Sequence, residues 1–194
     1  MTSLEVEQFV QVSLATRGCV PIIIPVGATE QHGPTGLCGT DILTASAVAT
    51  EVAAMNDCLL GPNLSIGMSL HHLDFPGSIS LRPSTLANVV CDVVHSLVQS
   101  SNITHCMFIN GHGGNMMALN YAKSLLKEQP LSPWKMQQLL EDNATVPDTP
   151  LTTIAGPKVD IISWYANNES QGLAKELYGN ELGQHATPDE VGRL

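Results

Sequence analysis

Two short apolar segments, each followed at once by a glycine-rich turn, constrain the fold of this chain more than any other feature. Residues 19–26 (CVPIIIPV) precede GATEQHGPTG, and residues 105–110 (HCMFIN) precede GHGGN. Apolar runs of this length, the first enriched in β-branched residues, are typical of buried strands. Helical patterns follow both turns, so strands alternate with helices. This order predicts an α/β layered fold with a mostly parallel central sheet flanked by helices, whose functional groups gather at the carboxyl ends of the strands.

The remaining elements are predicted from hydrophobic spacing and from glycine and proline. An Ala-rich helical pattern starts at Thr40, with Thr40 or Asp41 as its cap. Residues 59–68 are expected to form a short strand or loop, and residues 161–165 (IISWY) a further strand. Further helices are expected at residues 5–16, 84–100, 116–128 and 170–178.

One domain is expected over residues 1–194. Hydrophobic residues make up 43% of the chain and charged residues 13%, which is enough apolar surface for one sizeable core. No internal repeat interrupts the pattern. Residues 130–156 are rich in proline with little periodicity, and we expect a surface loop or insertion there, with one short helix near residues 134–141.

The charge balance excludes several classes of function. Eight Lys and Arg residues against 18 Asp and Glu give a formal charge of −10, which disfavours nucleic acids and anionic membranes as partners. The chain has no apolar run of about 18 residues, and its acidic start lacks a leader pattern, so we expect a soluble, cytoplasmic protein. The five cysteines have no Cys-x-x-Cys spacing, which favours reduced thiols over a disulfide framework or a zinc knuckle.

The densest chemical signal lies in residues 27–41, GATEQHGPTGLCGTD. Glu30, His32 and Asp41 follow the first buried strand among several glycines. Carboxylates and imidazoles are ligands for divalent metals such as zinc, manganese or iron. The alternative is structural, with Asp41 as a helix cap and with Glu30 and His32 solvated on a loop.

A second signal is the histidine in residues 109–115, INGHGGN. His112 follows the second buried strand directly and is flanked by glycines. It is either a metal ligand or a loop histidine with ordinary hydrogen bonds. Asn110 and Asn115 would fix its turn or cap the loop. A nucleotide-binding turn is disfavoured, because the spacing lacks the G-x-G-x-x-G pattern and the P-loop lysine.

Two further stretches carry ionisable groups. His185 and Glu190 lie in GQHATPDE near the end of the sequence. His71 and His72 precede a Phe-Pro-Gly turn in HHLDFPGSISLRPS. This second stretch either lines a pocket or forms a rigid surface loop, and the sequence favours neither.

Taken in order, the motifs E-x-H, G-T-D, F-P-G-[ST]-I-S, N-G-H-G-G-N and H-A-x-x-x-E resemble the creatininase family. The resemblance runs from about Pro21 to Glu190. It implies a single α/β domain that assembles as a homo-oligomer, often a hexamer, and hydrolyses amide-type C–N bonds with a pair of divalent metal ions. Relative to that family, the chain lacks the usual C-terminal extension.

The resemblance assigns ligands to both ions. Glu30 and His112 would bind one ion, His32 would bind the other, and Asp41 would bridge the two. Creatininase proper has a Glu ligand two residues after the His of its N-G-H motif. Gly114 stands at that place here, which argues against creatinine as the substrate.

The late motif would complete the site. Relatives with N-G-H-G-G-N complete the metal shell with a Glu five residues after the late His, which is Glu190 here, and His185 matches the family's mobile proton donor. The implied function is a metal-dependent amidohydrolase that cleaves a non-peptide or cyclic amide, such as a formamide or lactam, by attack of a metal-bridging hydroxide. The ions would be Zn, Mn or Fe, and the partner a small-molecule amide. The alternative is a truncated, catalytically silent family member that binds only metal or partners.

Overall fold

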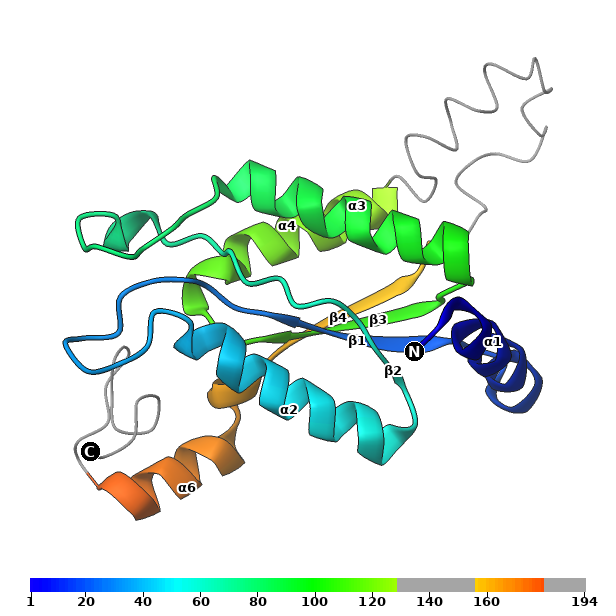
Figure 1. Ribbon diagram of the computed structural model, residues 1–194, viewed down its shortest axis with the longest axis horizontal. Coiled ribbons are helices and arrows are strands. Elements are labelled where there is room, and N and C mark those ends of the chain that lie inside the picture. The colour runs from blue at the N-terminus through cyan, green and yellow to red at the C-terminus, as the bar shows by residue number, and fades with distance from the viewer. Residues whose placement is uncertain (129–155, 180–194) are drawn as a thin grey trace.

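A four-stranded parallel sheet forms the centre of the molecule (Figure 1). The computed structural model describes residues 1–128 and 156–179. The strand order is β2-β1-β3-β4, and all neighbouring strands run parallel. The strands are β1 (Pro21–Val26), β2 (Leu59–Leu60), β3 (His105–Asn110) and β4 (Lys158–Ser163). The α/β class and the parallel central sheet expected from the sequence are therefore confirmed.

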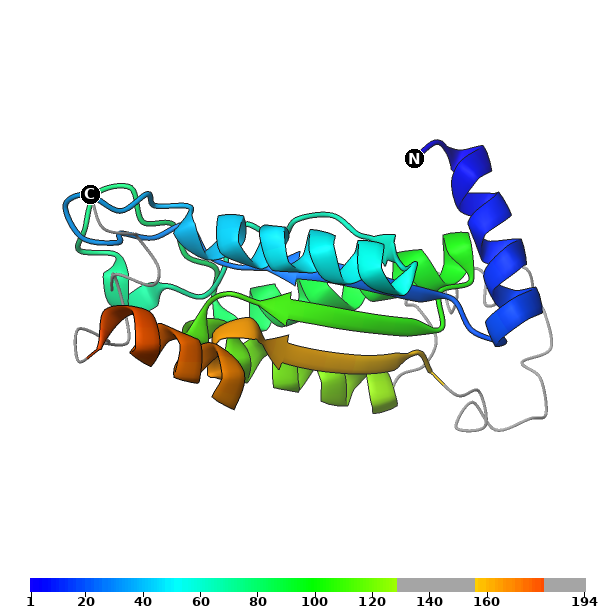
Figure 2. The same ribbon diagram turned by 90° about the horizontal axis from the view of Figure 1, so that it is seen from below.

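Helices cover both faces of this sheet and one of its ends. α3 and α4 lie on one face, α2 lies on the other, and α1 lies beyond the amino ends of the strands (Figures 1 and 2). The α-helices are α1 (Ser3–Arg17), α2 (Thr40–Asn56), α3 (Pro83–Ser101), α4 (Met116–Glu128) and α6 (Asn168–Tyr178). Short 3-10 helices span Leu70–His72, Gly113–Asn115 and Trp164–Ala166.

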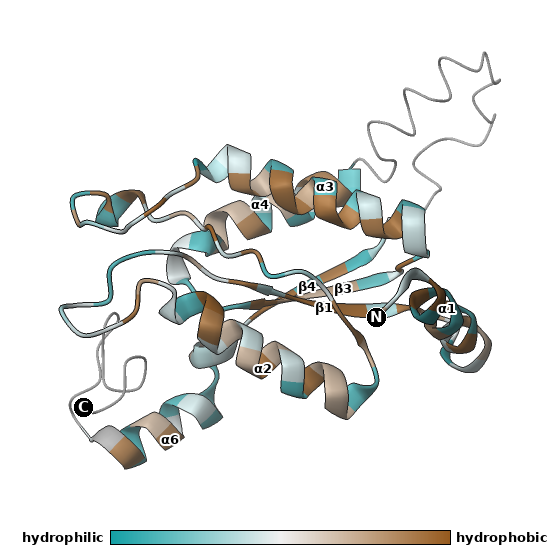
Figure 3. Ribbon diagram, in the orientation of Figure 1, coloured by the Kyte–Doolittle hydropathy of each residue, from teal (hydrophilic) through white to brown (hydrophobic). Residues whose placement is uncertain are grey.

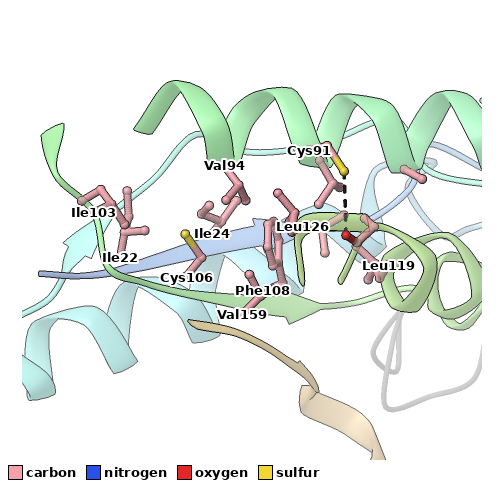
Figure 4. Packing of buried hydrophobic residues seen from close by; sticks show 14 of the residues in the cluster. Ile22, Ile24, Cys91, Val94, Ile103, Cys106, Phe108, Leu119, Leu126 and Val159 are labelled. Carbon is pink, nitrogen blue, oxygen red and sulfur yellow. Dashed lines mark hydrogen bonds between the residues drawn. The ribbon is translucent and has the colours of Figure 1, made fainter. Parts of the chain in front are cut away.

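The larger core lies between the sheet and α3 and α4. Side chains of β1 alternate between the two faces, so Ile22 and Ile24 enter this core while Ile23 faces α2. Phe108 of β3 is fully buried among them (Figure 4). Figure 3 shows the corresponding pattern, with hydrophobic residues along the strands and alternating with polar ones around α3 and α4.

The α2 face is packed with small residues. Ala45, Ala49 and Ala53 repeat at four-residue intervals and are buried against Ile23 and Ile109. Short side chains at this spacing let α2 approach the sheet closely.

The start of α2 corrects one expectation. The N-cap is Gly39, and neither Thr40 nor Asp41 caps the helix with its side chain. Both residues lie in the first turn instead. The Thr40 hydroxyl donates to the carbonyl of Leu37, and the Asp41 carboxylate is turned toward two histidines. The carboxylate is thus committed to a different set of partners.

Other segments differ from expectation in detail. Only Leu59–Leu60 of residues 59–68 forms a strand. The strand expected at 161–165 begins earlier, at Lys158, and gives way to a 3-10 helix at Trp164. Residues 129–155 lie outside the described residues, and with them the helix expected near 134–141.

Two further findings concern the cysteines and the membrane. All five cysteines carry free thiols, and burial raises the pKa of Cys91 to about 11 and that of Cys106 to about 12. Within residues 1–128 and 156–179, no helix combines the length and the apolar composition that crossing a membrane would require.

Candidate metal centre

The carboxyl ends of β1 and β3 bring four polar side chains together. Glu30 and His32 follow β1, Asp41 lies in the first turn of α2, and His112 lies two residues beyond β3. All four residues are buried. The interpretation of Glu30 and His32 as solvated loop residues is therefore wrong for this structure.

Two glycines allow the start of α2 to approach the strand ends. A Cβ atom at Gly27 would lie 2.4 Å from the backbone nitrogen of Ile42. A Cβ atom at Gly111 would lie 2.2 Å from the carbonyl oxygen of Asp41. Any side chain at either position would push α2 away, so these glycines fix where Asp41 sits.

Asp41 divides its carboxylate between two imidazoles. Its Oδ1 lies 3.0 Å from His32 Nε2, and its Oδ2 lies 3.1 Å from His112 Nδ1. Glu30 Oε1 lies 3.1 Å from the same His112 nitrogen. The ligand atoms of Glu30, Asp41 and His112 all lie within 4.8 Å of one another, which is suited to holding one cation.

The outer nitrogen of each imidazole faces a backbone carbonyl. His32 Nδ1 donates to the carbonyl of Glu30 at 3.1 Å, and His112 Nε2 donates to that of Met68 at 3.0 Å. A carbonyl only accepts, so a neutral ring keeps its proton on the outer nitrogen and presents a lone pair inward. That lone pair then faces a carboxylate oxygen. Such a donor set requires a proton or a metal ion between its members, so these residues fit a divalent cation.

The pKa values of these residues also indicate that the site needs positive charge. Burial favours the neutral form of His112, but hydrogen bonds to Asp41 and Glu30 outweigh it and raise the pKa of His112 to about 10. Burial likewise opposes ionisation of Glu30 and Asp41, yet hydrogen bonds from His112 hold both of their pKa values below the usual range. The two carboxylates therefore stay charged at neutral pH and select a positive partner.

Two asparagines hold the His112 turn. Asn110 Nδ2 donates to the carbonyl of His112 at 2.8 Å, and the His112 backbone N–H donates to Asn110 Oδ1 at 3.2 Å. Asn115 Nδ2 donates to the carbonyl of Gly27 at 2.9 Å and also to Asn110 Oδ1. Both asparagines are fully buried. They therefore link the turn after β3 to the end of β1.

The F-P-G-S-I-S segment supports the other side of the site. The Ile79 backbone N–H donates to the carbonyl of Thr29 at 2.8 Å, and the Gln31 N–H donates to Ser78 Oγ at 3.1 Å. The Ser69 N–H donates to Ser80 Oγ at 2.8 Å. This segment is thus hydrogen-bonded both to the loop that carries Glu30 and to the loop that carries His71 and His72.

Residues 70–72 bring two more histidines to the centre. His72 Nε2 lies 3.9 Å from Glu30 Oε1, and the His71 ring is stacked parallel to the His112 ring with centroids 5.9 Å apart. The stretch combines features of both alternatives, because His72 is half-buried beside the centre whereas His71 and Phe75 are exposed. The adjacent histidines indicated a functional stretch, but the sequence alone did not show which way they point.

Not every expected site residue can be placed. His185 and Glu190 lie outside the described residues. At Gly114, a Cβ atom would lie 2.3 Å from His112 Nε2 and 2.5 Å from the Met68 carbonyl oxygen. A side chain at position 114 is incompatible with this placement of His112.

A comparison with protein families shows to which family the chain belongs. The family model described as creatininase, creatinine amidohydrolase, matches residues 4–193. The chain belongs to the creatininase family. The resemblance drawn from the sequence motifs is thereby confirmed.

Relatives within the creatininase family carry several activities. The chain is 37% identical over 112 residues to the mycofactocin precursor peptide peptidase of Mycolicibacterium smegmatis, a match that covers 55% of this chain and 44% of the relative. It is 33% identical over 109 residues to the creatinine amidohydrolase of Pseudomonas putida, covering 54% of this chain and 41% of the relative. The match thus covers less than half the length of these relatives.

Solved creatininase structures share the architecture. The Mn form of creatininase superposes with a TM-score of 0.70 at 26% identity, covering 96% of this chain and 66% of the other. A mutant creatininase of Zn-Zn type gives a TM-score of 0.70 at 25% identity, with the same coverage of both chains.

Proposed function

We propose that this protein is a metal-dependent amidohydrolase that cleaves a non-peptide or cyclic amide bond. The observation that carries the proposal is the buried Asp41 carboxylate, each oxygen of which faces an imidazole nitrogen. Both imidazoles are fixed by backbone carbonyls so that their inner nitrogens can bind a cation. Zn or Mn in solved family structures supports the same ion class.

The proposed ligand sets follow from these contacts. Glu30, His112 and Oδ2 of Asp41 would hold one ion, and His32 with Oδ1 of Asp41 would hold a second. Glu190 is proposed to complete the second set. When bound, divalent ions supply Lewis acidity toward an amide carbonyl and make a bound water acidic enough to ionise near neutral pH.

The protein's own groups would carry charge and protons. Glu30 and Asp41 stay ionised in the buried site and offset the positive charge there. An amine is a poor leaving group unless it is protonated as the C–N bond breaks, and His185 is proposed as the donor. Asn110 and Asn115 keep His112 in place throughout.

A peptide is a second candidate substrate. The Mycolicibacterium smegmatis relative is a precursor peptide peptidase and, at 37%, shares more identity with this chain than the Pseudomonas putida creatinine amidohydrolase does. Gly114, where creatininase proper has a Glu, also separates this chain from a creatinine hydrolase. Cleavage of a peptide C–N bond also needs a polarised carbonyl and a proton donor for the leaving amine.

The test is hydrolysis by the full chain loaded with Zn or Mn. A panel of formamides, lactams and short peptides is compared between the wild type, His112→Ala and the control His105→Gln, whose histidine lies at the opposite end of β3. We expect turnover of at least one substrate class, lost by roughly 100-fold or more in His112→Ala and kept in His105→Gln. Equal rates in all three would refute catalysis at this site, and metal binding without turnover would favour the silent alternative.

The quaternary state is part of the proposal. We expect a homo-oligomer, and light scattering of the purified chain would measure its size. A monomer at working concentrations would contradict this part alone.

A further inference from the structure

Gln31 and His72 form a hydrogen-bonded pair beside the metal centre. Gln31 Nε2 lies 3.2 Å from His72 Nδ1, and the Gly33 backbone N–H donates to Gln31 Oε1 at 2.9 Å. An N–H can only donate, so this contact identifies the amide oxygen of Gln31. The amide NH2 group must therefore be the one that faces His72.

This pairing sets the tautomer of His72. Because the Gln31 NH2 group donates, His72 Nδ1 accepts, and the proton of the neutral ring resides on Nε2. Nε2 lies 3.9 Å from Glu30 Oε1. His72 thus directs an N–H toward the centre, whereas His32 and His112 direct lone pairs toward it.

We propose that His72 is a positioning residue, which directs a tautomer-fixed Nε2–H at Glu30 Oε1 and holds this carboxylate in the orientation that faces His112. The inference rests on the proposed function, because it concerns a ligand of the proposed ions. A hydrogen bond needs a donor–acceptor distance of about 3 Å, so a closure of about 1 Å would complete it. Carboxylates that bind metal ions commonly accept a hydrogen bond from a neighbouring side chain that does not itself bind the metal.

The surrounding loops support such a role. Ser78 Oγ accepts from the backbone N–H of Gln31, and Ser80 Oγ accepts from that of Ser69, next to the 3-10 helix Leu70–His72. The F-P-G-S-I-S segment therefore holds both Gln31 and the loop that carries His72. The His72 side chain is 15% exposed, so it lies at the boundary between the buried centre and solvent.

The competing hypothesis makes His72 a metal ligand. Ligand atoms of Glu30, His71 and His72 also lie within 4.8 Å of one another. The tautomer argues against this set, because the nitrogen that would bind the ion carries the proton. If His72 Nε2 bound an ion, the ring proton would move to Nδ1, and the hydrogen bond from Gln31 would be lost.

Metal affinity separates the two hypotheses. Zinc affinity of the full chain is measured by competition with a chromophoric chelator for the wild type, His72→Ala, His72→Gln and the control His105→Gln. A Gln amide places an N–H near the position of Nε2, so His72→Gln should stay close to the wild type, while His72→Ala should bind zinc about 10- to 100-fold more weakly. His105→Gln should be unchanged.

Each contrary result has a distinct meaning. If His72→Gln is as weak as His72→Ala, the ring is a ligand and the inference is overturned. If His72→Ala binds zinc as tightly as the wild type, the inference fails while the proposed function stands. If the wild type itself binds no zinc, both fail.

The tautomer can be observed directly. Two-bond 1H–15N spectra of the zinc-loaded protein distinguish a protonated ring nitrogen from an unprotonated one. We expect His72 to be protonated on Nε2 and not on Nδ1. A proton on Nδ1, or a zinc-bound Nε2, would overturn the inference.

Discussion

The middle of the molecule and the carboxyl end of its sheet are equally buried but are stabilised in opposite ways. Phe108 in the middle and Glu30 at the carboxyl end are both 0% exposed. Phe108 is surrounded by aliphatic side chains, which need only complementary packing. Glu30 adjoins a second carboxylate and needs positive charge. The first region therefore determines stability, and the second determines what the protein binds.

The largest expected effect comes from a change at the polar end. Asp41→Asn keeps the shape of the side chain but removes the charge that faces His32 and His112. Zinc affinity should fall by more than the roughly 100-fold that loss of an outer partner can cost, while circular dichroism shows an unchanged fold. Calorimetric titration with zinc measures it, and near-wild-type affinity would contradict the assignment of Asp41.

A change in the middle should do the reverse. Phe108→Ala opens a cavity in the larger core and should lower the free energy of unfolding by about 3–5 kcal/mol, measured by urea denaturation. Zinc stoichiometry should be retained wherever the variant is folded. The milder Ile24→Val, expected to cost about 0.5–1.5 kcal/mol, serves if Phe108→Ala does not fold. Loss of zinc binding in folded Ile24→Val would break the separation between the two regions.

A pair of neighbouring glycines tests how tightly the polar end is built. Gly114→Ala would place a Cβ atom 2.3 Å from His112 Nε2, whereas at Gly113 the nearest atom is Tyr165 Oη at 3.5 Å, an ordinary contact. Zinc affinity should drop about 10- to 100-fold in Gly114→Ala and remain near wild type in Gly113→Ala. Equal affinities in the two variants would mean that His112 is not held where the structure places it.

A further expected effect is the pH dependence of the metal-free protein. The pKa of His112 is raised from its ordinary 6.5 to about 10, so its stabilising contribution is complete below about pH 6.5 and declines as pH rises toward about 10. Urea unfolding at about pH 6 and about pH 9.5 should show this decline. The matched variant His112→Gln should lack it. Stability that rises over this range in the wild type would contradict the charge balance of the site.

Much of the fold could be predicted because it depends on local patterns. β3 and α4 have the bounds expected from their apolar runs and helical spacing. The cap of α2 could not, because the Asp41 carboxylate pairs with histidines that only the tertiary structure brings near. β2 is shorter than expected, because the ladder with β1 covers only Leu59 and Leu60 and pairing resumes as a single bridge between Leu64 and Val26.

The site was harder to predict than the fold. Residue types after the two strands indicated metal ligands, but their shared use of Asp41 came from the resemblance to a family. The sequence does not predict the orientation of His72, because that orientation depends on a hydrogen bond from Gln31, which lies 41 residues away in the sequence and whose backbone N–H donates to Ser78 Oγ. The backbone carbonyls that fix His32 and His112 leave no signature in a sequence.

The most direct test of the account is anomalous diffraction from crystals of the full chain grown with zinc or manganese. We expect one anomalous peak between His112 Nδ1, Glu30 and Oδ2 of Asp41, and a second between His32 Nε2 and Oδ1 of Asp41. Well-ordered crystals with the Asp41 carboxylate still bonded only to two protonated imidazoles, and no peak beside it, would contradict the metal centre.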